Sequence, residues 1–275
     1  CRRITGMMVG KGAEAMVIAC NTATSAAIAT LREEFDIPFV GMEPAVMPAA
    51  LGTESGVIGV LATAGTLKGS KYLCTKGRFE DEVRIEEHVG RGFVELVEAC
   101  ELSGDHAEEV VRASLEPLLQ AGADTIVLGC THYPFLLDTL KKTVQQIREY
   151  TVDGVAVYAK LLPENVNFID PAKFTAIEAY NALREDKQLA LSLEDTQVAA
   201  FISVPVYGLL PDQLTENGEL AYDFKYGREY GTEDIATVKV PLLPRYMGQD
   251  NMNRLASLVP VSYSYIFGGK SKLVE

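Results

Sequence analysis

Two cysteines lie in closely matching stretches of sequence. The first stretch covers residues 12–22 and reads GAEAMVIACNT; the second covers residues 122–132 and reads GADTIVLGCTH. Each stretch begins with Gly-Ala and an acidic residue, continues with an apolar run, and places a cysteine, Cys20 or Cys130, before polar residues. A thiolate can act as a base, and the thiol can return the proton. The repeat therefore predicts two matched catalytic arms facing one substrate, one removing a proton and the other returning it from the opposite side.

Polar side chains follow both cysteines. Asn21, Thr22 and Thr24 follow the first, and Thr131 and His132 follow the second. These side chains can hydrogen-bond a carboxylate, and His132 can move a proton beside the thiol. The alternatives are that they cap helices and that each cysteine is a small buried hydrophobe. Capping and binding are compatible, and the duplicated context favours chemistry at the thiols.

Three further residues are candidates on weaker grounds. Thr63 and Thr66 lie in the turn ATAGT after an apolar run, where they can contact a carboxylate or an amine or simply cap the next helix. Glu98 lies on a predicted helix, where a surface glutamate is the default interpretation. Cys74 and Cys100 lack a comparable set of polar neighbours, so we expect them to be structural.

The elements that position these residues alternate between strand and helix. Strands are predicted over 16–19, 37–40, 56–61, 83–86, 125–128 and 167–170. Helices are predicted over 3–10, 24–35, 44–50, 67–73, 93–100, 105–120, 135–150 and 171–184. This alternation is typical of α/β proteins with doubly wound parallel sheets, in which ligands bind at the carboxyl ends of strands. Cys20, Thr63 and Cys130 each follow such an end.

The composition argues against several classes of protein. Of the 275 residues 48% are hydrophobic, which is enough for about two domains with buried cores. The formal net charge of −13 argues against nucleic acid and anionic membranes as partners, although helix ends can still bind an acidic substrate. The five cysteines and three histidines form no CxxC or HExxH motif, so we expect neither a metal site nor disulfides. Free cysteines favour the cytoplasm, and no apolar stretch approaches the roughly 18 residues of a membrane span.

The two ends of the chain interrupt the alternation. A doubly wound domain normally opens with a strand, whereas this chain opens with a helix, so we expect the first domain to be incomplete at its N-terminus. After about Leu189 tyrosines cluster, prolines recur and periodicity weakens. We expect residues 189–275 to form an irregular or β-rich C-terminal extension without catalytic residues.

Four segments resemble the glutamate racemases of the aspartate/glutamate racemase superfamily. They are 17–24 (VIACNTAT), 127–134 (VLGCTHYP), 37–44 (IPFVGMEP) and 59–67 (GVLATAGTL). The two cysteine motifs in this order are strongly specific, and the resemblance extends over about residues 1–185. The Cys-Thr-His form of the second motif is similar to the glutamate branch, because the aspartate branch tends to carry a glutamate where His132 stands.

The resemblance implies a reaction and a set of residues. The reaction is the cofactor-independent interconversion of L- and D-glutamate, which supplies D-glutamate for peptidoglycan. Cys20 and Cys130 would be the two acid/base groups, with His132 beside the second and Glu98 in support. The residues expected to contact the substrate are Asn21, Thr22, Thr63, Thr66, Thr131 and His132.

The resemblance also implies two similar parallel-sheet domains with the active site between them. The first domain would comprise residues 1–43 and 152–188, and the second, inserted in it, residues 44–151; residues 189–275 would be the extension. The expected partner is glutamate, with no nucleic acid and no membrane, and a homodimer is left open.

The chain departs from the family pattern at its start. The family opens with a strand that carries Asp-Ser and a second segment that carries Tyr-Gly, and neither precedes Cys20. Weak or absent turnover by the chain as it stands is therefore an expectation. A racemase for aspartate or another acidic metabolite stays open, as does a non-catalytic remnant that binds a metabolite. A thiol-dependent hydrolase is a weaker alternative, because Cys and His so close in sequence rarely form a triad.

Overall fold

The computed structural model describes residues 1–158, 162–185, 198–205, 207–216, 221, 224 and 237–267. The chain divides into two compact units, Cys1–Leu189 and Ala190–Glu275. In the first unit strands and helices alternate, and both main sheets contain only parallel strand pairs. The predicted α/β class with parallel sheets is therefore confirmed.

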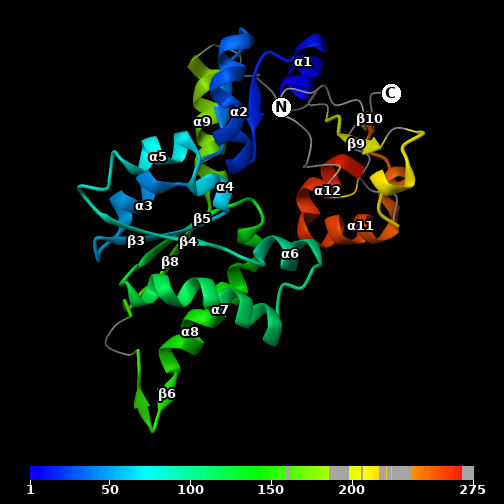
Figure 1. Cartoon of the computed structure of the whole chain (residues 1–275). Coiled ribbons are helices and arrows are strands. Elements are labelled where there is room, and N and C mark those ends of the chain that lie inside the picture. Colours follow the sequence, from blue (N-terminus) through cyan, green and yellow to red (C-terminus); the bar gives the residue numbers. More distant parts are fainter. Residues whose placement is uncertain are drawn as a thin grey trace. The chain divides into compact units, whose positions relative to one another are not determined.

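The larger sheet has the strand order β4-β3-β5-β8 (Figure 1). Its strands are β3 (Val57–Ala62), β4 (Arg84–Val89), β5 (Thr125–Gly129) and β8 (Asn167–Ile169). The strands β3 and β5 are apolar runs with almost every residue buried, as expected for parallel strands covered on both faces. Ala62 pairs with Gly129 in the register of β3 and β5. The residues that follow these two strands therefore meet at one edge of the sheet.

Helices cover both faces of this sheet (Figure 1). Helices α3 (Val46–Gly52) and α5 (Ser70–Lys76) lie on one face, where a core cluster joins Val46, Ala49, Ile58, Val60, Tyr72 and Val127. On the other face α7 (Asp105–Gln120) packs against β3 and β4, and α8 (Leu137–Glu149) packs against α7. A Cβ atom on Gly59 would lie 3.0 Å from Leu118 Cδ1, so glycine permits this close approach of α7. Burial of each fully buried aliphatic side chain stabilises the folded state by about 1.5–3 kcal/mol.

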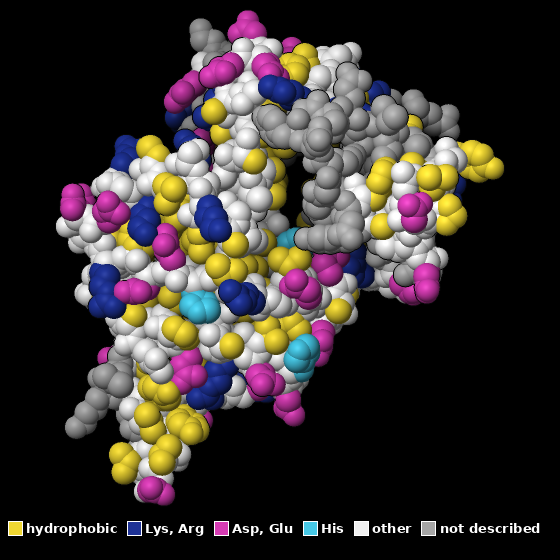
Figure 2. Space-filling model, in the orientation of Figure 1, with side chains coloured by type: hydrophobic (Ala, Val, Ile, Leu, Met, Phe, Trp, Pro, Cys, Tyr) yellow, Lys and Arg dark blue, Asp and Glu magenta, His cyan; other side chains and the backbone are white. Residues whose placement is uncertain are grey.

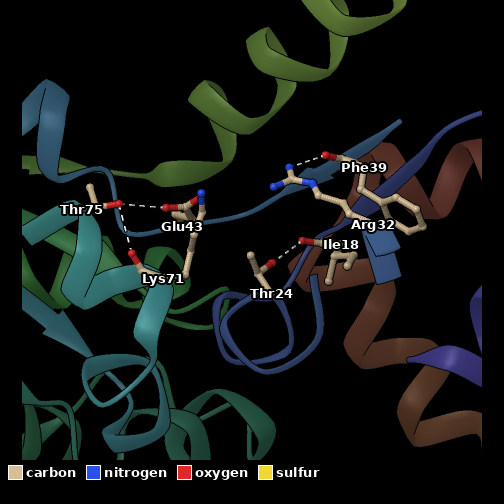
Figure 3. A network of polar contacts seen from close by, with 7 residues as sticks. All are labelled: Ile18, Thr24, Arg32, Phe39, Glu43, Lys71 and Thr75. Carbon is tan, nitrogen blue, oxygen red and sulfur yellow. Dashed lines mark hydrogen bonds and ion pairs between the residues drawn. The ribbon is translucent and has the colours of Figure 1, made fainter. Parts of the chain in front are cut away.

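A smaller sheet pairs β1 (Met16–Ile18) with β2 (Phe39–Gly41). Helix α2 (Asn21–Glu34) connects them and buries Ile28 and Leu31 against Phe39. Two side chains of α2 bind the strands directly: Arg32 Nη2 donates to Phe39 O (2.7 Å) and Thr24 Oγ1 donates to Ile18 O (3.1 Å) (Figure 3). Helix α1 (Arg2–Gly10) precedes β1, and α9 (Pro171–Glu185) packs against β2.

One polar network links the loop that follows β2 to helix α5, which covers the larger sheet. Glu43, just after β2, accepts a hydrogen bond from Thr75 (3.1 Å) and pairs with Lys71 (3.2 Å), both on α5 (Figure 3). The charged partners are half-exposed, so the ion pair contributes at most about 1 kcal/mol.

The division of this unit into racemase domains 1–43 with 152–188 and 44–151 stays a prediction. Strand β8 lies in the larger sheet, whereas α9 packs against both β2 and β5.

The helix predicted over 67–73 is wrong in its bounds. The chain forms two short helices instead, α4 (Ala64–Leu67) and α5, separated by Lys68 and Gly69. A Cβ atom on Gly69 would lie 2.5 Å from Ser25 Cβ, so the break is where the chain passes directly against α2. The helix predicted over 135–150 begins earlier, as the single 3₁₀ turn η1 (Tyr133–Leu136) that continues into α8.

A short hairpin follows α8 and was not predicted. Strands β6 (Thr151–Val152) and β7 (Val155–Ala156) join through Asp153 and Gly154, which both have positive φ (52° and 77°). Positive φ at both central residues is typical of a type I′ turn, which Asp-Gly favours. Apolar side chains gather over this hairpin (Figure 2), because Tyr150, Val152 and Val155 are exposed.

The second unit combines a strand pair with helices. Strand β9 (Phe201–Pro205) pairs antiparallel with β10 (Thr237–Pro241). The 3₁₀ turn η2 (Pro211–Gln213) follows β9, and α11 (Pro244–Leu258), interrupted at Gly248, precedes α12 (Pro260–Phe267). The expectation of an irregular or β-rich extension missed these two helices. Within the described residues, no helix is long and apolar enough to cross a membrane.

Candidate active site

The first cysteine lies at the start of α2. Cys20 has extended backbone angles (φ −149°, ψ 120°), its carbonyl accepts the N–H of Thr24 (2.8 Å), and its side chain is exposed. It thus occupies the N-cap position of α2, which begins three residues earlier than the predicted helix over 24–35. The partial positive charge of the helix N-terminus favours an anionic group there.

The next residue carries a buried amide without a partner. Asn21 is only 3% exposed, and neither its Nδ2 nor its Oδ1 atom has a hydrogen-bond partner within the described part of the chain. A buried polar group left without a partner costs about 1–3 kcal/mol. The Asn21 side chain therefore keeps its hydrogen-bonding groups unused by the described residues.

Three threonine hydroxyls from two segments form one cluster. Thr22 on α2 lies 3.0 Å from Thr63 and 3.2 Å from Thr66, and Thr63 lies 3.0 Å from Thr66, all measured between Oγ1 atoms. Thr63 also accepts the backbone N–H of Thr66 (3.2 Å), so it caps α4 as well. A Cβ atom on Gly65 would lie 3.2 Å from Thr22 Cγ2, a tight approach. The structure thus brings together three of the predicted site residues, graded from exposed Thr22 to fully buried Thr66.

The second cysteine lies in a different environment. Cys130 follows β5, is 9% exposed, and has its Sγ atom 3.7 Å from His132 Nδ1. Thr131 Oγ1 lies 3.4 Å from the same nitrogen. The other ring nitrogen, His132 Nε2, lies 2.9 Å from Glu98 Oε1 at the end of α6 (Phe93–Glu98). A thiol, an imidazole and a carboxylate therefore form one connected row.

This row changes the charge of the imidazole. Hydrogen bonds to Cys130 and Glu98 raise the pKa of His132 from 6.5 to about 9, although burial acts in the opposite direction. His132 is therefore an imidazolium at neutral pH, and both ring nitrogens can donate. The positive charge of the ring therefore lies beside the Cys130 sulfur.

Tyr133 is a supporting residue that the sequence analysis missed. Its hydroxyl donates to Gly90 O (3.2 Å), and its ring packs edge-on against Phe93 at 4.9 Å between centroids. Burial raises the pKa of this phenol further above its usual range, so it stays a neutral donor. Tyr133 fixes the turn after His132 to the start of α6. An aromatic residue directly after the Cys-Thr-His motif was the available signal.

The register of β3 and β5 places Thr63 and Cys130 after neighbouring strand ends. Ala62 and Gly129 are partners, so Thr63 and Cys130 leave neighbouring strands, which in parallel sheets are about 4.8 Å apart. A Cβ atom on Gly129 would lie 2.9 Å from Ala62 Cβ, so glycine permits this approach at the strand ends. Thr22 then joins the first cysteine segment to the same edge through Thr63. Among the described residues, hydrogen bonds do not join Cys20 to Cys130, and no group of acidic, Cys and His residues could hold a metal ion.

These features are those of an α/β protein in which one thiol follows a parallel strand in each of the two sheets. A sequence model of the family described as Asp/Glu/Hydantoin racemase matches residues 4–162, and the chain belongs to this family.

The chain is similar to several glutamate racemases. It is 48% identical over 162 residues to the glutamate racemase of Pseudomonas putida (strain W619), covering 58% of this chain and 61% of that protein. It is 41% identical over 191 residues to that of Stutzerimonas stutzeri (strain A1501), covering 69% and 66%. The chain thus spans less than two thirds of the length of these relatives.

Solved structures of glutamate racemases share the fold. The isoform RacE1 from Bacillus anthracis superposes with a TM-score of 0.54 at 31% identity, covering 66% of this chain and 61% of that one. The enzyme from Thermus thermophilus superposes with a TM-score of 0.52 at 28% identity, covering 69% and 63%. The sequence resemblance and the fold therefore lead to the same family.

Proposed function

We propose that this chain binds glutamate at the edge formed by Cys20, Thr63 and Cys130 and exchanges its α-hydrogen as part of a glutamate racemase. The observation that carries the proposal is that Thr63 and Cys130 follow neighbouring strands of the larger sheet, while Thr22, two residues after Cys20, lies 3.0 Å from Thr63 between Oγ1 atoms. The unpartnered amide of Asn21 supports it, because a substrate carboxylate or ammonium group would supply the missing hydrogen bonds.

The proposed reaction needs no redox change. One cysteine thiolate removes the α-proton of the amino acid and becomes a thiol. The carbanion then takes a proton from the other cysteine, which becomes the thiolate, and the configuration at the α-carbon is inverted. The protonation states of Cys20 and Cys130 are exchanged after each turnover, so the reverse reaction starts from the product state.

The surrounding groups would lower the barrier by position and charge. The α-hydrogen of an amino acid is very weakly acidic, and the proposal includes no cofactor that delocalises the carbanion, so hydrogen bonds must stabilise the developing negative charge. Asn21, the hydroxyl of Thr22 and the threonine turn at Thr63 and Thr66 are assigned to the substrate. His132, held by Glu98, is assigned to the second sulfur, where a positive charge stabilises the thiolate.

The biological setting is part of the proposal. Racemisation of glutamate would supply D-glutamate for peptidoglycan. All five cysteines are free, which suits the reducing cytoplasm. The homodimer that the sequence left open is tested by the concentration dependence of sedimentation.

The direct test follows α-hydrogen exchange in deuterium oxide by NMR, with L-glutamate and L-aspartate as alternative substrates. Whereas the sequence alone led to the expectation of weak or absent turnover, the proposal predicts measurable exchange with glutamate. It also predicts a loss of about 10²–10⁴-fold or more in Cys20→Ala and in Cys130→Ala, because each variant lacks one acid/base group. Cys74→Ala and Cys100→Ala are matched controls at exposed thiols and should keep the activity. Exchange that survives both active-site substitutions would refute the assignment, and faster exchange of aspartate would change the substrate.

A binding measurement separates catalysis from recognition. Calorimetry with glutamate on the same variants should show binding even where exchange is lost. If the unaltered chain binds glutamate without exchanging its hydrogen, it is a metabolite-binding domain and the catalytic proposal is wrong.

A further inference from the structure

A cavity lies at the edge of the larger sheet where its strands begin, opposite the edge of the candidate active site. It lies between α8 and the segment 164–168, which leads into the amino end of β8. Thr63 and Cys130 follow the carboxyl ends of strands in the same sheet, so this cavity is separate from the candidate active site. We infer that it binds a small organic anion that carries an apolar or aromatic body.

The cavity has the size and lining of a small-molecule site. Its volume is about 420 Å³, within the range of roughly 300–1,000 Å³ for such sites. Val144, Val166 and Phe168 form an apolar wall, and of these Val144 is 5% exposed. Phe168 is half-buried on the edge strand, paired with Ile126 of β5. This wall provides a surface on which an apolar group can lie.

The rim is cationic in a strongly acidic protein. Lys141, Lys142 and Arg148 line the cavity against one carboxylate, Glu164, whereas the whole chain carries a formal net charge of −13. A local excess of positive charge attracts an anion and opposes the repulsion by the rest of the molecule. The charge of the rim therefore selects an anionic group.

The three cations are not equivalent. Lys142 pairs with Glu108 (2.5 Å), which neutralises it. Arg148 uses Nη2 to donate to Pro163 O (2.8 Å), which fixes the segment over α8, and its other N–H groups stay available. Lys141 has no ion pair with the described residues and lies seven positions before Arg148, on the same face of the helix. We assign the anionic group to Lys141 and Arg148.

The test measures binding by calorimetry with two probes, naphthyl phosphate and inorganic phosphate. We expect saturable binding of naphthyl phosphate and at least about 10-fold weaker binding of inorganic phosphate, because only the first uses the apolar wall. Lys141→Glu should weaken the binding of naphthyl phosphate by about 10-fold or more. Lys173→Glu, on the exposed side of α9, is the matched control for net charge and should leave the affinity within about twofold.

Three outcomes would overturn the inference. The first is no saturable binding of naphthyl phosphate in the millimolar range. The second is an equal loss of affinity for naphthyl phosphate in Lys141→Glu and Lys173→Glu, which would mean that only the net charge of the protein attracts the ligand. The third is equal affinity for the two probes, which would remove the apolar body from the ligand. Since the readout is binding away from the cysteines, its failure would leave the proposed racemase activity untouched.

Discussion

The two cysteine segments are near copies in sequence but differ in their surroundings. Cys20 is exposed, follows a two-stranded sheet, and is followed by a buried amide and a hydroxyl cluster. Cys130 is buried, follows the larger sheet, and has an imidazolium and a carboxylate in a row. A similar strand-turn-helix sequence thus supports two kinds of environment, because neighbouring segments supply the polar groups. We expect one arm to act mainly through hydrogen-bond donors and the other through charge.

Removing the charge from the second arm should have the largest effect. In His132→Asn the exchange rate should fall by about 10²–10⁴-fold, because the positive charge beside the Cys130 sulfur is lost. Steady-state exchange in deuterium oxide measures it. His106→Asn is the matched control, since His106 also bonds a carboxylate, Glu101, but is exposed. Equal rates in the two variants would place His132 outside the reaction.

Removing the Asn21 amide from the first arm should weaken the binding of glutamate without lowering the stability of the fold. In Asn21→Ala glutamate affinity should fall by about 10-fold, because one set of ligand hydrogen bonds is lost. The free energy of unfolding without ligand should stay equal or rise by up to about 1–3 kcal/mol, because the deleted amide is buried without a partner among the described residues. Calorimetry and urea unfolding measure the two quantities. A large loss of stability would show that Asn21 serves the fold instead.

In the second arm, His132 should give the stability of the protein a pH response. The pKa of His132 in the folded protein is about 9, above its ordinary value of 6.5, so protonation favours the folded state. The resulting stability is fully present below pH 6.5 and is lost as the pH rises towards about 9. In Glu98→Gln one cause of the raised pKa is removed, so an NMR titration of His132 should have a lower midpoint. The thermal stability should also decline at lower pH than in the unaltered chain. An unchanged midpoint would contradict the assigned Glu98 contact.

The smallest effect concerns the end of the helix that carries Glu98. Cys100 has a positive φ of 56°, while its N–H bonds Val97 O and the next N–H, of Glu101, bonds Leu96 O. This is a Schellman ending with a cysteine where glycine is favoured. Cys100→Gly should raise the free energy of unfolding by up to about 1 kcal/mol, because the strain on Cβ is removed. Urea unfolding with Cys74→Gly, inside α5, provides the contrast, since that change should destabilise.

Much of the fold could be predicted from short apolar runs and from the turn residues that separate them. The runs at 56–61 and 125–128 are too short for helices and too apolar for exposed strands, so they predicted strands; in the structure they are β3 and β5, the two central strands of a parallel sheet. The turn after the first of them made Thr63 and Thr66 candidates for helix capping or for contact with a ligand, and Thr63 does cap α4. Helices α11 and α12 were missed because they bury little and so lack a clear apolar stripe; within them only Met252 is buried.

The site was harder to predict than the sheet. Local sequence gives Cys130 and His132, but the contact of His132 with Glu98 joins residues 34 positions apart and depends on how α6 packs beside η1. The burial of Cys130 and the exposure of Cys20 are also products of packing, since the two local sequences match. The hydroxyl cluster required Thr22 to meet Thr63 across 41 positions, which no periodicity encodes.

The pairing of Ala62 with Gly129 has a consequence far beyond its two small side chains. Side chains alternate between the faces of a strand, so a slip of β5 by a single position would turn its side chains to the opposite face and bring Thr131 to the place of Cys130. Mutations deep in the sheet that loosen this alignment would displace the Cys130 sulfur without changing any residue beside it, and under the proposed function they would abolish exchange. A screen for inactive variants should therefore find hits among interior apolar positions such as Ile126.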